Sequence, residues 1–552
     1  MKKHVVLLAA SLVAVGQLLA QTTQAPAKKK DDAPVPSGSQ TDGAFRKVIL
    51  EADTQADGKF IDSLKDPMEL AVAPDGRVFY AQRDGTVKMI KPGAKEGIVI
   101  AKLDVFTGLE DGMLGITLDP NFEKNNWVYL NRSMPPTTTN AVTGGKAGII
   151  RVARFTLAGE KLDLASEKTI IEIPTQREQC CHVGGSIAFD GKGNLLVAVG
   201  DNTNPFDSDG FSPSDSRPGR SPWDAQKSSA NPNALTGKVL RVTPKIEGGY
   251  DIPSGNLFKP GTAGTRPEIY AMGTRNSFRV SADQKTGYVY WGDVGPDAGG
   301  PSEKRGPAGF DEINQARTAG FFGWPYFVAD NKPYAKIDFA ARADNKKAKE
   351  AYDKAVKAKE AYDKAVKEKK TPLSLPLPLP PKPTDWLASG EPELYDALKP
   401  VNDSANNTGL RQLPPAQPAF IYYPPGQSTR FPAVGSGGRT AMAGPVYYFD
   451  EKLQSPHKLP KEFDRTLFIY EWSRNWIISV KLDENHNIAK KADGSPAMER
   501  FCPNMTFKRP MDLELGADGC LYLIEFGTAW GNNKDTQIVR IEHTGVATTA
   551  VK

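Results

Sequence analysis

Pairs of alternating apolar runs, each pair joined by a tight turn, recur along this chain of 552 residues. Asp-Gly or Lys-Gly between two such runs is the sequence signal of a β-hairpin. A short meander cannot bury both of its faces alone, so units repeated at intervals of tens of residues favour a β-propeller. Five clear units begin at Ala71, Ile116, Ile187, Val280 and Leu513.

A sixth unit is indicated by Ala443–Phe449 together with Arg465–Trp472. The chain also contains 51 Gly and 44 Pro residues, which favours turn-rich β structure over a helical bundle. The units are irregularly spaced, so periodicity alone leaves the number of blades open. We predict an all-β propeller domain over residues 44–545.

One stretch interrupts this pattern. The sequence AKEAYDKAVK occurs twice, at Ala348–Lys357 and Ala358–Lys367, and its Ala, Glu and Lys residues are strong helix formers. The Pro-rich segment Thr371–Thr384 follows and must be extended. We therefore predict a helical and Pro-rich insertion over residues 341–390, placed in a surface loop. A passive insertion and a partner-docking arm both fit this pattern.

The first residues have the pattern of a secretory signal peptide. Residues 1–20 contain two Lys, an apolar run and a small residue, Ala20, which predicts cleavage near that position. Residues 21–43 are polar and Pro-rich and predict a disordered leader, and residues 546–552 form a tail. Because no later stretch approaches 18 apolar residues, we expect a periplasmic or secreted protein that does not span a membrane.

The formal charge of +5 comes from two segments outside the predicted propeller blades. Residues 1–20 contribute +2, and residues 346–370 contribute +5 through ten Lys against five acidic residues. Without these contributions the formal charge is −2. A nucleic-acid-binding protein would carry a dense basic face, so we expect no nucleic-acid partner.

Histidine is scarce, and only one His lies in a setting that favours chemistry. No HExxH, CxxC or CxxCH spacing is present, which argues against a zinc site or covalent haem. His182 is followed by Gly184 and Gly185 and flanked by apolar runs, as a ligand-facing base requires. A structural His at the start of a strand fits the same pattern.

Six motifs in order resemble the glucose/sorbosone dehydrogenase family, which includes soluble quinoprotein glucose dehydrogenases and aldose dehydrogenases that use pyrroloquinoline quinone (PQQ). The resemblance covers roughly residues 60–330 and, more weakly, 415–545. It implies a six-bladed β-propeller with the cofactor at one mouth. The motifs are Glu110–Leu130, Cys181–Asn194, Leu235–Val242, Glu268–Val280, Arg305–Asn314 and Ala319–Phe327.

The resemblance assigns roles around the quinone. His182 matches the general base that takes the hydroxyl proton while hydride passes from the sugar carbon to the quinone. Arg275 and Asn276 match the pair that contacts PQQ, and Arg275 would also neutralise oxyanion charge in catalysis. Arg439 and Arg474 are further candidates for binding the PQQ carboxylates, although either also fits a salt bridge between blades.

The resemblance also implies calcium and substrate positions. Gly306 and Pro307 match the Gly-Pro whose carbonyl oxygens ligate calcium, a hard cation that prefers oxygen ligands. Asp311 and Glu312 match an acidic pair that supports the calcium loop or caps strands. Glu110 aligns with a substrate-contacting position, and a solvated turn is the alternative for this residue.

Three features depart from the family pattern. Cys181, preceded by Cys180, stands where the soluble glucose enzymes carry an acidic residue. A vicinal disulfide, two free thiols, and bridges to Cys502 and Cys520 are all consistent with the sequence. Phe278 replaces an amide. A second Gly-Pro, residues 295–296, leaves open which of the two motifs carries calcium.

We therefore expect a PQQ- and calcium-dependent dehydrogenase of an aldose or related sugar hydroxyl, with electrons passed to an external acceptor such as a cytochrome or quinone. A calcium-dependent lactonase-like propeller is an alternative, although a quinone-facing Arg argues against it. A propeller that binds carbohydrate or partners without catalysis is another. PQQ binding and dye reduction would distinguish the dehydrogenase from both alternatives.

Overall fold

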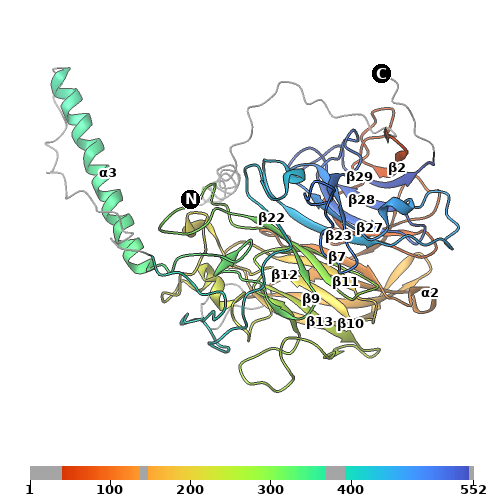
Figure 1. Ribbon diagram of the computed structural model, residues 1–552, viewed down its shortest axis with the longest axis horizontal. Coiled ribbons are helices and arrows are strands. Elements are labelled where there is room, and N and C mark those ends of the chain that lie inside the picture. The colour runs from red at the N-terminus through yellow and green to blue at the C-terminus, as the bar shows by residue number, and fades with distance from the viewer. Residues whose placement is uncertain (1–39, 137–146, 369–391, 546–552) are drawn as a thin grey trace, which may run out of the picture.

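The computed structural model describes residues 40–136, 147–368 and 392–545. In these ranges, six sheets of four to six strands form a six-bladed β-propeller, and β20 (Phe327–Val328) and β21 (Lys332–Pro333) form a small separate sheet (Figure 1). This confirms the predicted fold class. The predicted signal peptide, most of the leader, the Pro-rich strap and the tail lie outside the described residues.

The first three blades follow the chain from the N-terminal side. The first blade is β3 (Pro67–Val72), β4 (Val78–Gln82), β5 (Thr86–Ile90) and β6 (Ile98–Lys102). The second is β7 (Met113–Leu118), β8 (Trp127–Ser133), β9 (Ala147–Ala158) and β10 (Lys161–Gln176), with the short helix α2 (Phe122–Asn125) between its first two strands. The third is β11 (Gly184–Phe189), β12 (Leu195–Val199), β13 (Lys238–Pro244) and β15 (Ile269–Met272), joined by β14 (Tyr250–Asp251) and β19 (Gly320–Phe321).

The other three blades complete the ring. The fourth is β16 (Ser277–Ala282), β17 (Val289–Asp293), β18 (Asp311–Ala316) and β22 (Ile421–Tyr423). The fifth is β23 (Ala441–Tyr447), β24 (Thr466–Glu471), β25 (Trp476–Lys481) and β26 (Met498–Arg500). The sixth is β27 (Pro510–Leu515), β28 (Leu521–Glu525), β29 (Gln537–His543), β2 (Phe45–Ala52) and β1 (Gln40–Asp42).

Each predicted hairpin is the first pair of strands of one blade. The five clear units correspond to β3–β4, β7–β8, β11–β12, β16–β17 and β27–β28, and the sixth corresponds to β23–β24. The first strands contact one another in a closed ring around the axis. The alternating apolar residues of these strands are buried between neighbouring blades because each sheet packs face to face on the next.

The ring closes with strands from the two ends of the described chain. In the sixth blade, β2 pairs antiparallel with β29, with Val48 opposite Arg540 and Lys47 opposite Ile541. Figure 1 shows β2 beside β28 and β29 at the same side of the molecule. The hydrogen bonds of this pair hold a strand from the start of the described chain in the last blade, and the chain continues from it into β3 of the first blade.

In each blade, the loop before the first strand and the loop after the second strand lie on the same face of the propeller. In an antiparallel pair, the start of one strand and the end of its partner lie at the same edge. His182 precedes β11, Arg275 precedes β16 and Arg439 precedes β23, whereas Asp201 follows β12. The topology therefore brings side chains from distant parts of the sequence to a single face.

The helix predicted in the insertion is α3 (Phe339–Lys367). Figure 1 shows it projecting from the propeller rather than covering a sheet. Its base is anchored by the buried Phe339 and by an ion pair between Arg342 and Asp209. Among the residues that the structure describes, no helix combines the length and the apolar character needed to cross a membrane.

A buried charged cluster crosses the centre of the propeller. Arg279 of β16 donates to the carbonyl oxygens of Met68 and Met511, and its Nε lies 3.4 Å from Asp512 Oδ1. Glu69 of β3 accepts the backbone N–H of Ile116 at 2.7 Å. Burial, followed by the charge of Asp512, raises the pKa of Glu69 from 4.5 to about 8, although Arg279 opposes this shift. The cluster thus links the first strands of different blades, but burying its charged groups costs desolvation free energy.

A Glu69→Gln variant is expected to be more stable than wild type at about pH 9, by on the order of a few kcal/mol. The folded state holds a proton on Glu69 that the unfolded chain releases at lower pH. Stability from this group therefore decreases as the pH rises from 4.5 to about 8. Urea unfolding at about pH 5 and pH 9 measures the difference. The exposed Glu123→Gln is the control, and an advantage for Glu69→Gln that is equal at both pH values would contradict the prediction.

Candidate active site

His182 lies at the axial face just before β11, and 4% of it is exposed. Its backbone N–H donates to Glu110 Oε2 at 2.7 Å, and its ring Nδ1 lies 2.7 Å from Asp201 Oδ1. The neighbouring strand can approach because residue 200 is Gly: a Cβ there would lie 2.2 Å from the His182 carbonyl oxygen. The predicted base is therefore fixed by both its backbone and its ring.

Asp201 is the second member of a buried pair that the sequence analysis missed. Its Oδ1 also accepts the backbone N–H of Thr203 at 2.9 Å, and its Oδ2 accepts Trp324 Nε1–H at 2.8 Å. With Nδ1–H donated to Asp201, His182 Nε2 carries the free lone pair of a base. The signal in the sequence was an Asp directly after the second strand of the His182 hairpin, at the edge where the topology returns to His182.

The two Cys residues before His182 form a vicinal disulfide, Cys180–Cys181. Cys502 and Cys520 are both buried free thiols, so the sequence alternative of bridges to them is wrong. Burial raises the pKa of each of these two thiols, which makes them poor nucleophiles. The disulfide places a compact covalent ring directly before His182.

Arg275 and Asn276 lie beside the His182 pair. The Asn276 Oδ1 accepts the Gly184 backbone N–H at 3.1 Å, and the Arg275 carbonyl accepts the Asp201 backbone N–H at 2.7 Å. Asp293 Oδ1 accepts the backbone N–H of Asn276 at 2.7 Å, and burial raises the pKa of Asp293 to about 7. The structure therefore joins the predicted base and the predicted Arg-Asn pair through backbone contacts.

The side chains of Arg275 and Arg439 reach the same short segment after β17. Arg275 Nη1 donates to the Val294 carbonyl at 2.7 Å, and Arg439 Nη2 donates to the Pro296 carbonyl at 2.7 Å. Arg439 Nη1 also donates to Asp311 Oδ1 at 3.1 Å. Two guanidinium groups thus flank residues 294–296 close to the His182 pair.

The two Gly-Pro motifs differ in their surroundings. Gly295–Pro296 lies between Arg275 and Arg439, whereas the Gly306 carbonyl accepts the Ser302 backbone N–H at 2.8 Å in a local bridge. A Cβ at Gly306 would meet the Pro333 carbonyl and Tyr334, each at 3.0 Å. The geometry thus associates the upstream motif more closely with the two arginines.

The predicted acidic pair is fully buried. Asp311 accepts the backbone N–H groups of Gly295 and Ala441, and Glu312 accepts that of Ala329. Burial raises the pKa of Asp311 and, reinforced by the charge of Asp293, raises that of Glu312 to about 8. No cluster of three or more His, Cys, Asp or Glu with metal-binding geometry occurs in the described ranges. Asp311 therefore supports the loops around residues 295 and 439, and Glu312 supports the turn at residue 329.

Arg474 is engaged in a different way from Arg275 and Arg439. Its guanidinium donates to the carbonyl oxygens of Pro424, Val434, Gly435, Gly437 and Gly438. These bonds clamp the loop before β23. Binding a carboxylate through Arg474 would require the loss of some of these contacts.

Comparison with solved structures shows the same fold. An oxidoreductase of Thermus thermophilus, described as a glucose dehydrogenase, superimposes with a TM-score of 0.51 at 19% identity, covering 90% of this chain and 99% of that one. The soluble aldose sugar dehydrogenase of Escherichia coli in its apo form gives a TM-score of 0.51 at 16% identity, covering 90% and 99%. At this identity the likeness supports the fold alone.

Three bacterial proteins are among the sequence relatives. Aldose sugar dehydrogenase YliI of Escherichia coli is 26% identical over 266 residues, which cover 48% of this chain and 60% of that protein. Quinoprotein glucose dehydrogenase B of Acinetobacter calcoaceticus is 25% identical over 305 residues, covering 54% and 58%. An uncharacterized protein of Synechocystis is 25% identical over 285 residues, covering 50% and 60%. The matches thus span about 60% of the length of these relatives.

The family model described as Glucose / Sorbosone dehydrogenase matches residues 64–362, which is more than half of the 552-residue chain. This region contains the His182–Asp201 pair, Arg275 and both Gly-Pro motifs. The chain belongs to the glucose/sorbosone dehydrogenase family.

Proposed function

We propose that the protein is a PQQ- and calcium-dependent dehydrogenase that oxidises a hydroxyl of an aldose or related sugar. The observation that carries this proposal is the buried His182–Asp201 pair beside Arg275 at the axial face. Such a pair provides a base for a hydroxyl proton, and the neighbouring arginine provides positive charge where an anionic quinone would bind. Membership of the family and its quinoprotein relative support the same assignment.

The residues at this face fit a cofactor rich in carboxylate and carbonyl oxygens. Arg275 Nε and Tyr334 Oη are buried and have no hydrogen-bond partner within the described part of the chain. Burial raises the pKa of Tyr334 above its usual range, so its hydroxyl is a donor. Oxygen atoms of a bound PQQ would satisfy donors of this kind. We propose that Arg275, Asn276 and Arg439 hold PQQ, with Arg474 as a weaker candidate.

We place the calcium ion at the carbonyl-rich loops near these arginines rather than at a cluster of acidic side chains, because no cluster with metal-binding geometry occurs among the described residues. Carbonyl oxygens suit calcium, and either Gly295–Pro296 or Gly306–Pro307 could supply them. We propose the downstream motif, because the Pro296 carbonyl of the upstream one already accepts from the guanidinium of Arg439, a cation that would repel calcium. Asp311 would then hold the loops at Gly295 and Ala441, and Glu312 the turn at Ala329. When bound, the quinone and calcium would supply a hydride acceptor and a Lewis acid.

The chain's own residues would carry the proton. Asp201 holds the His182 ring so that Nε2 can accept the proton of a sugar hydroxyl, and its carboxylate stabilises the imidazolium that forms. Trp324 fixes the second oxygen of Asp201. Glu110, which is exposed and holds the His182 backbone, is the proposed substrate contact. Electrons would leave to an external cytochrome or quinone, and the predicted signal peptide favours a periplasmic or secreted site of action.

A spectroscopic titration of the protein with PQQ, in calcium and then in EDTA, tests this proposal. We expect saturation at one PQQ per chain in calcium and weaker binding in EDTA. An Arg275→Gln variant should bind PQQ at least about tenfold more weakly, because a charge-assisted contact to an anion is lost. The control is Arg411→Gln, which alters an exposed arginine paired with Asp403.

Absence of PQQ binding at high micromolar concentration would overturn the dehydrogenase assignment. Equal PQQ affinity in wild type and Arg275→Gln would overturn the placement of the cofactor beside Arg275. In the first case, release of acid from sugar lactones without a redox acceptor would identify a hydrolase on the same fold. Carbohydrate binding without either reaction would identify a non-catalytic propeller.

A further inference from the structure

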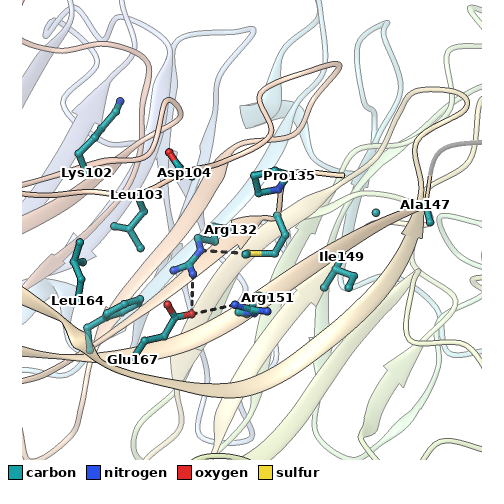
Figure 2. Close-up of a pocket in the computed structure, with 13 residues that line it drawn as sticks. Lys102, Leu103, Asp104, Arg132, Pro135, Ala147, Ile149, Arg151, Leu164 and Glu167 are labelled. Atoms are coloured by element: carbon teal, nitrogen blue, oxygen red, sulfur yellow. Dashed lines mark hydrogen bonds and ion pairs between the residues drawn. The ribbon is translucent and has the colours of Figure 1, made fainter. Parts of the chain in front are cut away.

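A pocket of about 600 Å³ lies between the first and second blades, and neither His182 nor Asp201 lines it (Figure 2). It is formed by the end of β6, the end of β8 and the facing parts of β9 and β10. Nothing in the proposed reaction uses it. Its lining residues are Lys102, Leu103, Asp104, Arg132, Met134, Pro135, Ala147, Gly148, Ile149, Arg151, Phe155, Leu164 and Glu167.

Arg132 is the central polar residue of this pocket. Only 4% of it is exposed, yet its guanidinium is only partly engaged. Nη2 donates to Glu167 Oε1 at 2.7 Å and Nε donates to Met134 Sδ at 3.3 Å, as the dashed lines in Figure 2 show. Nη1 is buried and has no hydrogen-bond partner among the residues described. A buried donor of this kind requires an acceptor oxygen, which a ligand in the pocket can supply.

The charged groups around Arg132 limit the net charge of a ligand that can bind there. Glu167 is shared between Arg132 and Arg151, whose Nη1 lies 3.3 Å from Glu167 Oε1. Arg151 also pairs with Glu172. The exposed Asp104 lines the rim together with Lys102. A single negative charge can be accepted beside Arg132, whereas a dianion such as phosphate would be repelled by the nearby carboxylates.

The rest of the pocket is suited to an apolar body. Leu103 and Leu164 lie on one side of Arg132, and Ile149 and Pro135 on the other. Phe155 also lines the pocket, and the centre of its ring lies 5.5 Å from the Arg132 guanidinium carbon. Leu164 is 47% exposed, so the apolar wall extends to the pocket entrance. Removing such surface from water on binding is favourable.

The floor of the pocket is rigid. Arg177 donates to the carbonyl oxygens of Met134 and Ile149, both of which line the pocket, and its Nη2 lies 3.2 Å from Asp111 Oδ1. Its guanidinium also stacks 4.4 Å from the centre of the Phe106 ring. The two strand ends that frame Arg132 are therefore fixed by one buried side chain.

We propose that this pocket binds a small amphipathic monocarboxylate. One carboxylate oxygen accepts from Arg132 Nη1, and the apolar tail packs against Leu103, Phe155 and Leu164. The interaction is independent of PQQ and calcium. It therefore gives the protein a second ligand site whose occupancy does not require the proposed reaction.

Isothermal titration calorimetry on the full chain at low salt and near neutral pH tests the proposal. The probes are hexanoate, 1-hexanol and hexylammonium, which share one tail and differ in the head group. We expect hexanoate to bind at millimolar concentration and each of the others at least about tenfold more weakly. Arg132→Gln should weaken hexanoate by about tenfold or more.

A second variant, Leu164→Asp, keeps the test decisive if Arg132→Gln, which alters a buried residue, fails to fold. Leu164 lies at the rim, so a carboxylate there should repel hexanoate while the fold remains intact. Arg411→Gln should bind hexanoate as wild type does. Equal affinity for hexanoate and 1-hexanol, wild-type binding in both pocket variants, or no binding up to about 20 mM would each overturn the proposal. Because no PQQ or calcium is added, failure here is separate from failure of the dehydrogenase assignment.

Discussion

A His182→Gln variant is expected to lose about 10²- to 10⁴-fold in kcat for sugar oxidation, the range typical of removing a positioned general base. Gln retains polarity and volume at this buried position but cannot take up a proton near neutral pH. A dye-reduction assay at saturating sugar, PQQ and calcium measures the loss. PQQ affinity should change by less than about threefold, since His182 is not among the residues proposed to bind the PQQ carboxylates.

The matched control is His457→Gln. His457 is partly exposed, and its Nδ1 lies 3.2 Å from the His543 carbonyl, far along the chain from the candidate site. This variant should retain wild-type kcat. A His182→Gln enzyme with kcat within about threefold of wild type, and with PQQ bound, would show that another group takes the proton.

An Asp201→Asn variant should lower kcat by about 10²- to 10⁴-fold while leaving the KM for sugar nearly unchanged. The amide has one oxygen, whereas Asp201 accepts from both His182 and Trp324. If that oxygen faces Trp324, the amide N–H₂ faces His182 Nδ1 and forces the proton onto Nε2. The base then has no lone pair directed at substrate, although the ring stays in place.

The split between kcat and KM separates this positioning role from a structural one. In Asp201→Asn, kcat should fall while the KM for sugar and the midpoint of urea unfolding stay near those of wild type. Asp403→Asn, which alters an exposed carboxylate paired with Arg411, is the control and should leave kcat unchanged. A parallel loss of folding and activity in Asp201→Asn would assign Asp201 to the scaffold alone.

The blades were predictable because each begins with a local signal. A tight turn between two alternating runs specifies the hairpin without knowledge of distant residues, and this identified β3–β4 and β23–β24 alike. The outer strands of the blades were harder to predict from the sequence. The first blades continue directly along the chain, but β22 and β19 come from beyond long loops, and their partners are decided by tertiary packing.

The sequence predicted those site residues for which a single motif contains both the residue and the neighbours that position it. His182 and Arg275 belong to such motifs, and the structure brings them together. Asp201 was missed because its relation to His182 depends on the return of β12 to the same face. The donors of Arg474 are directed to loop carbonyls, a property that no sequence spacing encodes.

The pairing of β2 with β29 has a consequence for how the molecule is made. β2 ends at Ala52 and β29 begins at Gln537, so the first of the two strands to be synthesised must wait for almost the whole chain before it finds its partner. Until then β2 and the free edge of β28 present unpaired backbone groups, a surface prone to aggregation. Folding should therefore finish only after synthesis ends, and a nascent chain stalled before Gln537 should remain a chaperone client however many blades it already holds.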